Sequence, residues 1–402
     1  MYMTKSFLFT SEAVSEGHPD KVCDQISDGV LDAVLAQDAG GHVACETLAT
    51  TNFVSLAGEV NFQGKSPDYE QIVRKTVAEI GYDREGEGFQ SSSLKVENRL
   101  HKQSADIVRG VSEDTSITGE QGAGDQGIMF GYACDDTPAL MPAPIHYAKL
   151  LLRRLSQLRR GSPDFAFLRP DAKSQLTFRY EDGRPVAVTS IVVSHQHEEG
   201  AGEGVRQAVR QVLQEVIPPE MLQDIDLHRV NERGGQLYIN PTGNFVIGGP
   251  DGDTGLTGRK IIVDTYGGAG RHGGGAFSGK DPSKVDRSAC YMLRHIAKNL
   301  VAAGAARRCE LQVAYAIGVT DPLAFNVNFF GTGRVSEEKV VKLLQDRELF
   351  DCRPAQISRD LGLLAPRGWS YQESAAYGPF GWEGFPWEKL NRVEEVKAAL
   401  GL

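Results

Sequence analysis

The segment 266–287 limits the fold most, because seven of the thirteen residues in 267–279 are glycine. So many residues without side chains do not suit a helix or a strand, and fixing each of them costs backbone entropy. Lys280 and Lys284 follow the glycines, and Asp281-Pro282 is typical of the N-cap and first position of a helix. Backbone N–H groups, a helix N-terminus and two ammonium groups together suit a polyphosphate.

The charges around this run indicate that a metal accompanies the anion. The segment 251–287 carries six cations and five carboxylates, more acid than a site for an anion alone would hold. Cations can hold phosphate oxygens while carboxylates hold Mg²⁺; the alternative is a helix start with ordinary surface ion pairs. The cations are Arg259, Lys260, Arg271, Lys280, Lys284 and Arg287, and the carboxylates are Asp251, Asp253, Asp264, Asp281 and Asp286.

The glycine run also approaches the P-loop pattern, which makes a kinase-like, ATP-dependent phosphotransferase the alternative function. Gly274 and Gly279-Lys280 have the required spacing, but Asp281 stands where a P-loop has the hydroxyl that binds its metal. A strand is predicted at 261–265, too far before the lysine for a standard P-loop turn. Neither a nucleophile signature nor a dinucleotide fingerprint after a strand is present.

Composition places the chain among ordinary globular proteins. Its 402 residues suffice for two or three domains, and 41% apolar with 24% charged residues is unremarkable. The net charge of −10 argues against nucleic-acid binding, and no apolar run reaches the length of a membrane span. The start lacks signal-peptide character, and six scattered cysteines predict reduced thiols and a cytoplasmic location.

Periodicity predicts loosely alternating helices and strands with frequent hairpins, and therefore an α+β fold with mixed sheets. A helix beginning near Pro19 puts His18 and Asp20 at its N-terminus. Two strands contain Glu46 and Glu59, for which the pattern alone favours a solvated face. Further helices are predicted at 69–80, 145–158, 204–216, 281–303 and 335–349, strands at 6–9, 42–49, 53–62, 127–133, 310–319 and 323–330, and hairpins at 176–193 and 236–248.

Two further segments invite a functional interpretation. The stretch 97–124 loses its apolar pattern and is long for a connection, which is typical of an active-site lid or of disorder. His195 and His197 could share a strand face as metal ligands, but without a third ligand nearby a structural role at a strand end is favoured.

Four motifs together resemble the S-adenosylmethionine synthetases (methionine adenosyltransferases), and the resemblance covers essentially the whole chain. They are Ser15-Glu-Gly-His-Pro-Asp-Lys21, Gly122-Ala-Gly-Asp-Gln-Gly127, Gly258-Arg-Lys260 with Val263-Asp-Thr-Tyr-Gly-Gly268, and Gly273-Gly-Gly-Ala-Phe-Ser-Gly-Lys-Asp281. The family makes S-adenosylmethionine from ATP and L-methionine. The methionine sulfur attacks C5′ and displaces the triphosphate, which is then hydrolysed to pyrophosphate and phosphate.

The resemblance also implies an architecture. Three similar α+β domains surround a pseudo-threefold axis and are assembled from interleaved segments. The expected division is 4–105, a mobile gating region at 106–120, 121–246 and 247–390. Active sites are expected where two subunits of a homodimer or homotetramer meet, with two Mg²⁺ and a K⁺ as cofactors.

The implied site residues fall into groups by role. Those with a catalytic role are His18, Lys173, Arg259, Lys260 and Lys280; ATP contacts add Asp171, Asn244, Phe245, Asp253 and Ala276, with Asn244 where many relatives carry arginine. Methionine is expected to meet Glu59, Gln103, Asp253 and Lys284. Metal ligands are Asp20 and Asp286 for Mg²⁺ and Glu46 for K⁺, and Asp125 is a further acidic position.

Overall fold

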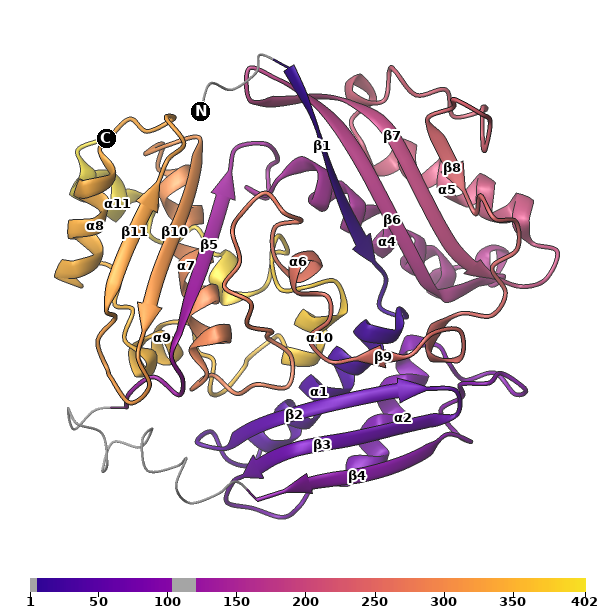
Figure 1. The fold of residues 1–402 in the computed structure, drawn as a ribbon, viewed down its shortest axis with the longest axis horizontal. Coiled ribbons are helices and arrows are strands. Elements are labelled where there is room, and N and C mark those ends of the chain that lie inside the picture. The colour runs from indigo at the N-terminus through magenta and orange to yellow at the C-terminus, as the bar shows by residue number, and fades with distance from the viewer. Residues whose placement is uncertain (1–5, 103–120) are drawn as a thin grey trace.

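The computed structural model describes residues 6–102 and 121–402, and it contains three separate β-sheets with helices packed on them. One sheet has the strand order β1-β6-β7-β8, a second β4-β3-β2-β9 and a third β11-β10-β5. The three sheets lie around a common centre (Figure 1). Most pairs are antiparallel, but β3–β4 and β7–β8 are parallel, so the predicted α+β class with mixed sheets is confirmed.

The sheets are built from segments that lie far apart in the chain. Strand β1 (Ser6–Val14) pairs antiparallel with β6 (Leu168–Glu181), from Ser6 opposite Glu181 to Val14 opposite Lys173. Strand β9 (Gly255–Leu256) pairs with β2, and β5 (Gly127–Cys134) pairs with β10. Each sheet therefore exchanges one strand with another part of the chain, which confirms the predicted interleaving. The remaining strands are β2 (His42–Thr50), β3 (Phe53–Asn61), β4 (Lys95–His101), β7 (Arg184–His197), β8 (Leu237–Ile239), β10 (Arg308–Tyr315) and β11 (Ala324–Asn328).

Local sequence signals account for most of the helices. In α1 (Pro19–Leu35), proline occupies the first turn and the His18 side chain caps the N-terminus. Helix α2 (Tyr69–Ile80) is capped by Asp68 and ends at Gly81, whose φ of 108° suits glycine. The others are α4 (Ala143–Gly161), α5 (Gly202–Val216), α6 (Ile261–Asp264), α7 (Val285–Ala302), α8 (Glu337–Asp346), α9 (Pro354–Asp360), α10 (Tyr371–Ala376) and α11 (Val393–Leu400). Within the described ranges, no helix is long and apolar enough to cross a membrane.

Three predictions about local structure were wrong. The stretch predicted as a strand at 261–265 contains the short helix α6. The hairpin predicted at 236–248 has only its first strand, β8, which pairs parallel with β7. Helix α7 begins at Val285 and not at Asp281-Pro282, because the side chain of Asp281 accepts a hydrogen bond from Ser283 N (2.9 Å) in a turn that precedes the helix.

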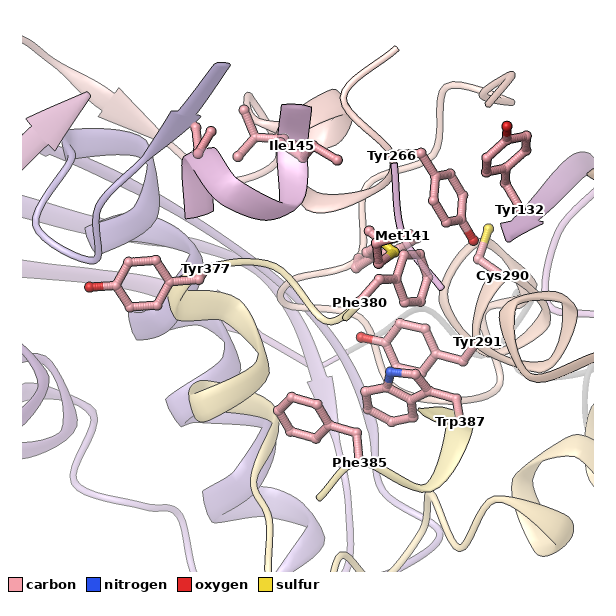
Figure 2. Close-up of a cluster of buried hydrophobic side chains, with 14 of the residues drawn as sticks. Tyr132, Met141, Ile145, Tyr266, Cys290, Tyr291, Tyr377, Phe380, Phe385 and Trp387 are labelled. Carbon is pink, nitrogen blue, oxygen red and sulfur yellow. The ribbon is translucent and has the colours of Figure 1, made fainter. Parts of the chain in front are cut away.

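An aromatic cluster connects the C-terminal tail to the centre of the molecule (Figure 2). Trp387 is fully buried, stacks on Phe385 at 5.0 Å and lies 3.9 Å from Tyr291 of α7 between ring centroids. Tyr266, the residue before the glycine run, stacks on Phe380 at 5.3 Å. The start of the glycine-rich loop is thereby anchored in the core, since buried aromatic pairs of this kind are stabilising.

Candidate active site

His18 lies at the N-terminus of α1 with its imidazole almost completely buried (4% exposed). Burial and the nearby Lys260 ammonium lower its pKa to about 3, so the ring is neutral at physiological pH. Its Nδ1 accepts a hydrogen bond from Asp20 N at 3.2 Å. A neutral imidazole has one acceptor and one donor, so the proton is on Nε2 and can be donated to an oxygen of a ligand.

Asp20, next to His18 on the same turn, joins two cations of the Gly258-Arg-Lys260 motif. Its Oδ2 accepts from Lys260 Nζ at 2.5 Å, and its Oδ1 lies 3.8 Å from Arg259 Nε. Burial alone would raise the pKa of Asp20, but the hydrogen bonds from Lys260 and Leu256 N hold this pKa below its usual value. The structure thus brings an ionised carboxylate, a neutral imidazole and two cations together.

A cavity of about 160 Å³ opens beside His18 and contains five of the predicted residues. Its walls come from the N-terminus of α1, from the start of β6 and from the long loop between β8 and β9. Elements separated by more than 200 residues therefore meet at one hollow, as ligand sites in clefts require. The predicted residues that line the cavity are His18, Asp171, Lys173, Phe245 and Asp253.

Asp171 carries a buried oxygen that has no partner among the described residues. Its Oδ2 accepts from Gly249 N at 2.8 Å, whereas Oδ1 has no hydrogen bond. Burial raises the pKa of this carboxyl to about 6. An unpaired buried acceptor is costly, so this oxygen indicates a ligand that brings a hydroxyl or amino donor into the cavity.

A second group of predicted residues surrounds the end of the glycine run. Lys280 Nζ lies 2.7 Å from Asp286 Oδ2, and Lys284 is paired with Asp281. Lys280 is also close enough to Glu46 of β2 to lower the pKa of that carboxyl. The pKa of Glu46 is nevertheless raised overall, because neighbouring groups partly shield its carboxylate from water. The backbone connects them too, since Lys280 and Ala44 form an isolated β-bridge.

Two further predicted residues lie near this second group. Ala276 packs against the Gly258-Arg-Lys260 motif, because a Cβ at Gly258 would lie 2.7 Å from that of Ala276. The loop that carries Asp125 runs alongside α7, with Gly124 N donating to Ser283 O at 3.3 Å. Asp125 itself is exposed and accepts a hydrogen bond from Gln126 N.

Glu46 and Glu59 lie on the outward face of their sheet, as the alternation predicted. Glu46 is exposed on β2, and Glu59 on β3 stands opposite Ala44, two residues before Glu46. The side chain of Glu59 is 38% exposed and lies 3.6 Å from His101 Nε2. Both carboxylates therefore face away from α1 and α2, which cover the other side of this sheet (Figure 1).

Two predicted residues cannot be placed in either group. Asn244 is exposed, next to Phe245, whose carbonyl accepts from His197 N at 2.9 Å. Gln103 and the predicted gating region 106–120 lie outside the described residues. His195 and His197 are buried at the end of β7, where each Nδ1 contacts a backbone carbonyl, in agreement with the structural role favoured for them.

The structure does not favour the P-loop interpretation of the glycine run. No strand leads into the loop, and α7 begins five residues after Lys280. Asp281, in the position of the metal-binding hydroxyl, is buried and accepts from Val43 N at 2.8 Å and from Lys284. Its carboxylate already accepts hydrogen bonds from groups of the protein, so it is not free to bind a metal in place of that hydroxyl.

The donor set fits Mg²⁺ held by single carboxylates and substrate. In the parts of the chain that the structure describes, no three His, Cys, Asp or Glu side chains gather as a metal site. Mg²⁺ at nucleotide sites is commonly held by one or two carboxylates together with phosphate oxygens and water. Asp20 and Asp286 match this chemistry, because each pairs with a lysine that can turn to the phosphates instead.

Sequence reasoning missed three aspartates of α1, two of which contact the site loops from behind. Asp24, Asp28 and Asp32 follow Asp20 at four-residue spacing, which on a helix forms one stripe. Asp24 and Asp28 are fully buried, and Asp28 forms a two-pronged ion pair with Arg287 at 2.6 and 2.7 Å. The four-residue spacing of these aspartates is visible in the sequence, but the helix was predicted from its apolar residues alone.

Comparison with known proteins identifies the family. The N-terminal, central and C-terminal domains of S-adenosylmethionine synthetase match residues 6–105, 120–245 and 247–389. An S-adenosylmethionine synthase from Desulfosudis oleivorans is 51% identical over 404 residues, covering all of both chains. The chain therefore belongs to the S-adenosylmethionine synthetase family.

Proposed function

We propose that the protein is a methionine adenosyltransferase, which transfers the adenosyl group of ATP to the sulfur of L-methionine and hydrolyses the resulting triphosphate to pyrophosphate and phosphate. The observation that supports this most is the cavity that joins His18, Asp171, Lys173, Phe245 and Asp253. It combines an aromatic wall, an unpaired buried acceptor and a neutral donor, which suit a nucleoside. The cations Arg259 and Lys260 stand beside it for the phosphates.

The protein supplies positioning and charge, since the nucleophile is the thioether of methionine. As the sulfur bonds to C5′, the C5′–O bond breaks and its electrons leave with the triphosphate. His18 Nε2–H donates a hydrogen bond to the departing oxygen. Arg259, Lys260, Lys173 and Lys280 stabilise the growing negative charge, which is where preorganised donors contribute most.

Asp20 and Asp286 are the residues that would hold Mg²⁺, and Glu46 would hold K⁺. Bound Mg²⁺ supplies charge neutralisation to the triphosphate oxygens. The depressed pKa of Asp20 keeps that carboxylate ionised for this purpose. In the free protein, Lys260 and Lys280 neutralise the two aspartates. If these carboxylates held Mg²⁺ instead, both lysines would be available to bind phosphate oxygens.

Methionine is assigned to Lys284, Glu59, Asp253 and Gln103, the four residues for which the family resemblance implies this role. Lys284 would take its carboxylate, while Glu59, Asp253 and Gln103 would take its ammonium group and orient its sulfur. Asp253 is exposed at the mouth of the cavity, where it can reach both substrates. ATP would further contact Asn244 and Ala276, and Asp125 would act as an additional acidic position.

We also propose that two copies complete each site, as a homodimer or a pair of homodimers. All three sheets carry their main helices on one side and leave the other uncovered (Figure 1). Exposed apolar side chains occur on strands of several sheets, including Leu8, Ile128 and Leu256. A second copy that covered these faces would remove such side chains from water, which is favourable. Glu46 and Glu59 lie on an uncovered face, where a second copy could use them.

Two more predictions are kept as proposals. The division of the chain at 105–106, 120–121 and 246–247 agrees with the ends of the described elements, although the sheets exchange strands across it. A cytoplasmic location is supported by six buried cysteines that form no disulfide.

The test is to incubate the protein with ATP, Mg²⁺, K⁺ and L-methionine and to identify the products. Pyrophosphate, phosphate and a sulfonium product that require methionine are expected. Formation of ADP would support the kinase-like alternative instead. Binding of ATP without any turnover would contradict both.

A further inference from the structure

Four aspartates of α1 bind the backbone of segments more than 200 residues away. We call Asp20, Asp24, Asp28 and Asp32 the aspartate ladder. Each carboxylate accepts a hydrogen bond from main-chain N–H. The donors are Leu256 to Asp20 (3.0 Å), Gly258 to Asp24 (2.9 Å), Gly279 to Asp28 (2.8 Å), and Tyr371 and Gln372 to Asp32 (3.0 and 2.9 Å).

The two middle members meet the backbone directly before the cations that the proposed function uses. Gly258 precedes Arg259 and Lys260, and Gly279 precedes Lys280. On the basis of the proposed function, we infer that Asp24 and Asp28 are positioning residues. They fix the two glycines and thereby hold the cations in the direction that the leaving triphosphate requires.

Both glycines have conformations that side chains rarely adopt. Their φ values are +78° and +80°, and a Cβ at Gly279 would lie 1.9 Å from the Cys45 carbonyl oxygen. A loop of glycines is flexible unless something else fixes it, because no side chain packs. A buried carboxylate bound to an N–H supplies that constraint, and charge-assisted hydrogen bonds are the stronger kind.

The carboxylate of Asp28 is itself held rigidly. Arg287 binds it through two nitrogens and also donates to the Lys280 carbonyl at 3.1 Å. Lys280 is therefore flanked by fixed backbone, at Gly279 N on one side and at its own carbonyl on the other.

Asp24 is held by a single ion pair instead of a two-pronged one. Its Oδ2 lies 3.0 Å from Lys21 Nζ, and Lys21 is also paired with Asp264, the last residue of α6. Helix α6 directly follows Lys260, so this chain of contacts fixes the backbone on both sides of the Arg259-Lys260 pair.

The last member of the ladder, Asp32, provides an internal comparison. Asp32 makes the same kind of bond, but to the N-terminus of α10, where none of the proposed catalytic cations is adjacent in sequence. If the ladder only stabilised the fold, loss of Asp32 and loss of Asp28 would affect turnover equally at equal stability. If it positions cations, only loss of Asp28 lowers turnover.

The experiment compares Asp28→Asn/Arg287→Met with Asp28→Leu/Arg287→Met. Removing both charges avoids leaving a buried unpaired arginine. The two double variants then differ in one respect: asparagine keeps an oxygen for Gly279 N, and leucine does not. When both variants are assayed at a temperature at which both are folded, we expect the leucine variant to have a kcat lower by at least about tenfold than the asparagine variant and a similar KM for ATP. Its melting temperature should also be lower, because the buried Gly279 N–H loses its acceptor. Equal kcat values would overturn the inference.

Asp32→Leu against Asp32→Asn is the matched control. A shift in melting temperature with kcat within about twofold is expected, because the Asp32 contacts lie on α10. A loss of turnover as large as that of the Asp28→Leu double variant would contradict a positioning role.

Amide hydrogen exchange of the wild-type protein tests the anchoring without any variant. Gly258 and Gly279 N–H should be protected to nearly the degree of α1; exchange at the rate of an unstructured peptide would overturn the inference. Formation of the sulfonium product by the wild-type protein is measured alongside. Its absence would count against the proposed function, whereas an active wild type with equal double variants counts against the ladder alone.

Discussion

The two groups of the site differ in how complete they are within one chain. The cavity beside His18 opens to solvent, but it contains a neutral imidazole and a buried carboxylate oxygen that has no hydrogen-bond donor among the described residues. The group around Lys280 lies next to the uncovered face of a sheet, and its lysines are already paired with Asp286 and Asp281. Under the proposed function, the first group could receive a nucleoside as it stands, whereas the second would have to exchange its ion pairs when phosphates and metal bind.

This difference assigns different work to the two groups. Buried side chains with few other conformations or partners contribute recognition and orientation of a ligand, because they rearrange little when it binds. Cations held by carboxylates near the surface contribute charge where it develops, and their partners prevent mutual repulsion in the free protein. The following experiments test this division.

Lys280→Ala should have the largest effect. Removing a cation from the leaving triphosphate is expected to lower kcat by about 1,000-fold, since stabilisation of developing charge is usually the largest catalytic contribution. The melting temperature should change little, because Lys280 lies on the site loop and pairs only with Asp286 among the ion pairs of the described residues. Lys342→Ala on the exposed surface of α8 is the control. Near-normal kcat in Lys280→Ala would remove it from the proposed mechanism.

Mixing two inactive variants tests whether the groups come from different copies. His18→Ala and Lys280→Ala are unfolded together, refolded and assayed. If each site takes one group from each copy, a mixed dimer contains one intact site, and about a quarter of wild-type activity should return. If both groups of a site belong to one chain, every site stays defective and activity does not recover.

His18→Asn should lower kcat by about 100-fold, because the shorter side chain withdraws the donor from the departing oxygen. Asparagine is a good N-cap, so the stability of α1 should be retained. The pKa of His18 is about 3, so the wild-type kcat should show no His18 titration near pH 6.5. A His18 titration observed near that pH by NMR would contradict the neutral donor.

Asp171→Asn should have the smallest effect, a rise of about tenfold in the KM for ATP, because the amide offers the nucleoside one acceptor fewer. Burial raises the pKa of Asp171 to about 6, so the carboxyl gains its proton as the pH falls through 6. The wild-type kcat/KM for ATP should therefore decrease below about pH 6. The variant should lack this decrease; an unchanged acid limb would assign it to another group.

Sequence patterns were sufficient where a local signal determines structure. Pro19 and the apolar spacing placed α1, and the periodic pattern predicted a helix at 69–80, the bounds that α2 has in the structure. They failed at 261–265, where a short apolar run fits a strand or a helix equally well. They also failed at Asp281, whose capping chemistry serves a turn and the edge of β2 instead of a helix.

The sequence was enough to predict which residues belong to the site, but not how they are arranged in space. Motif resemblance named the residues, yet only the fold showed that Asp171, Phe245 and Asp253 share a cavity with His18. The roles of Asp24 and Asp28 depend on partners more than 200 residues away, and no local pattern specifies such contacts. Burial of Asp281 likewise became apparent only from its tertiary contacts.

The position of α1 has a consequence for synthesis on the ribosome. This helix is made well before one of the segments that it contacts, because Asp32 meets its partners only when Tyr371 and Gln372 have been made. At about 5–20 residues per second, roughly 20 to 70 s pass between the synthesis of Asp32 and that of its partners, and its carboxylate lacks their hydrogen bonds during this time. We therefore expect chaperones, and the choice of codons between Asp32 and Gln372, to affect the yield of folded protein. The thermodynamic stability of the folded protein should affect this yield less.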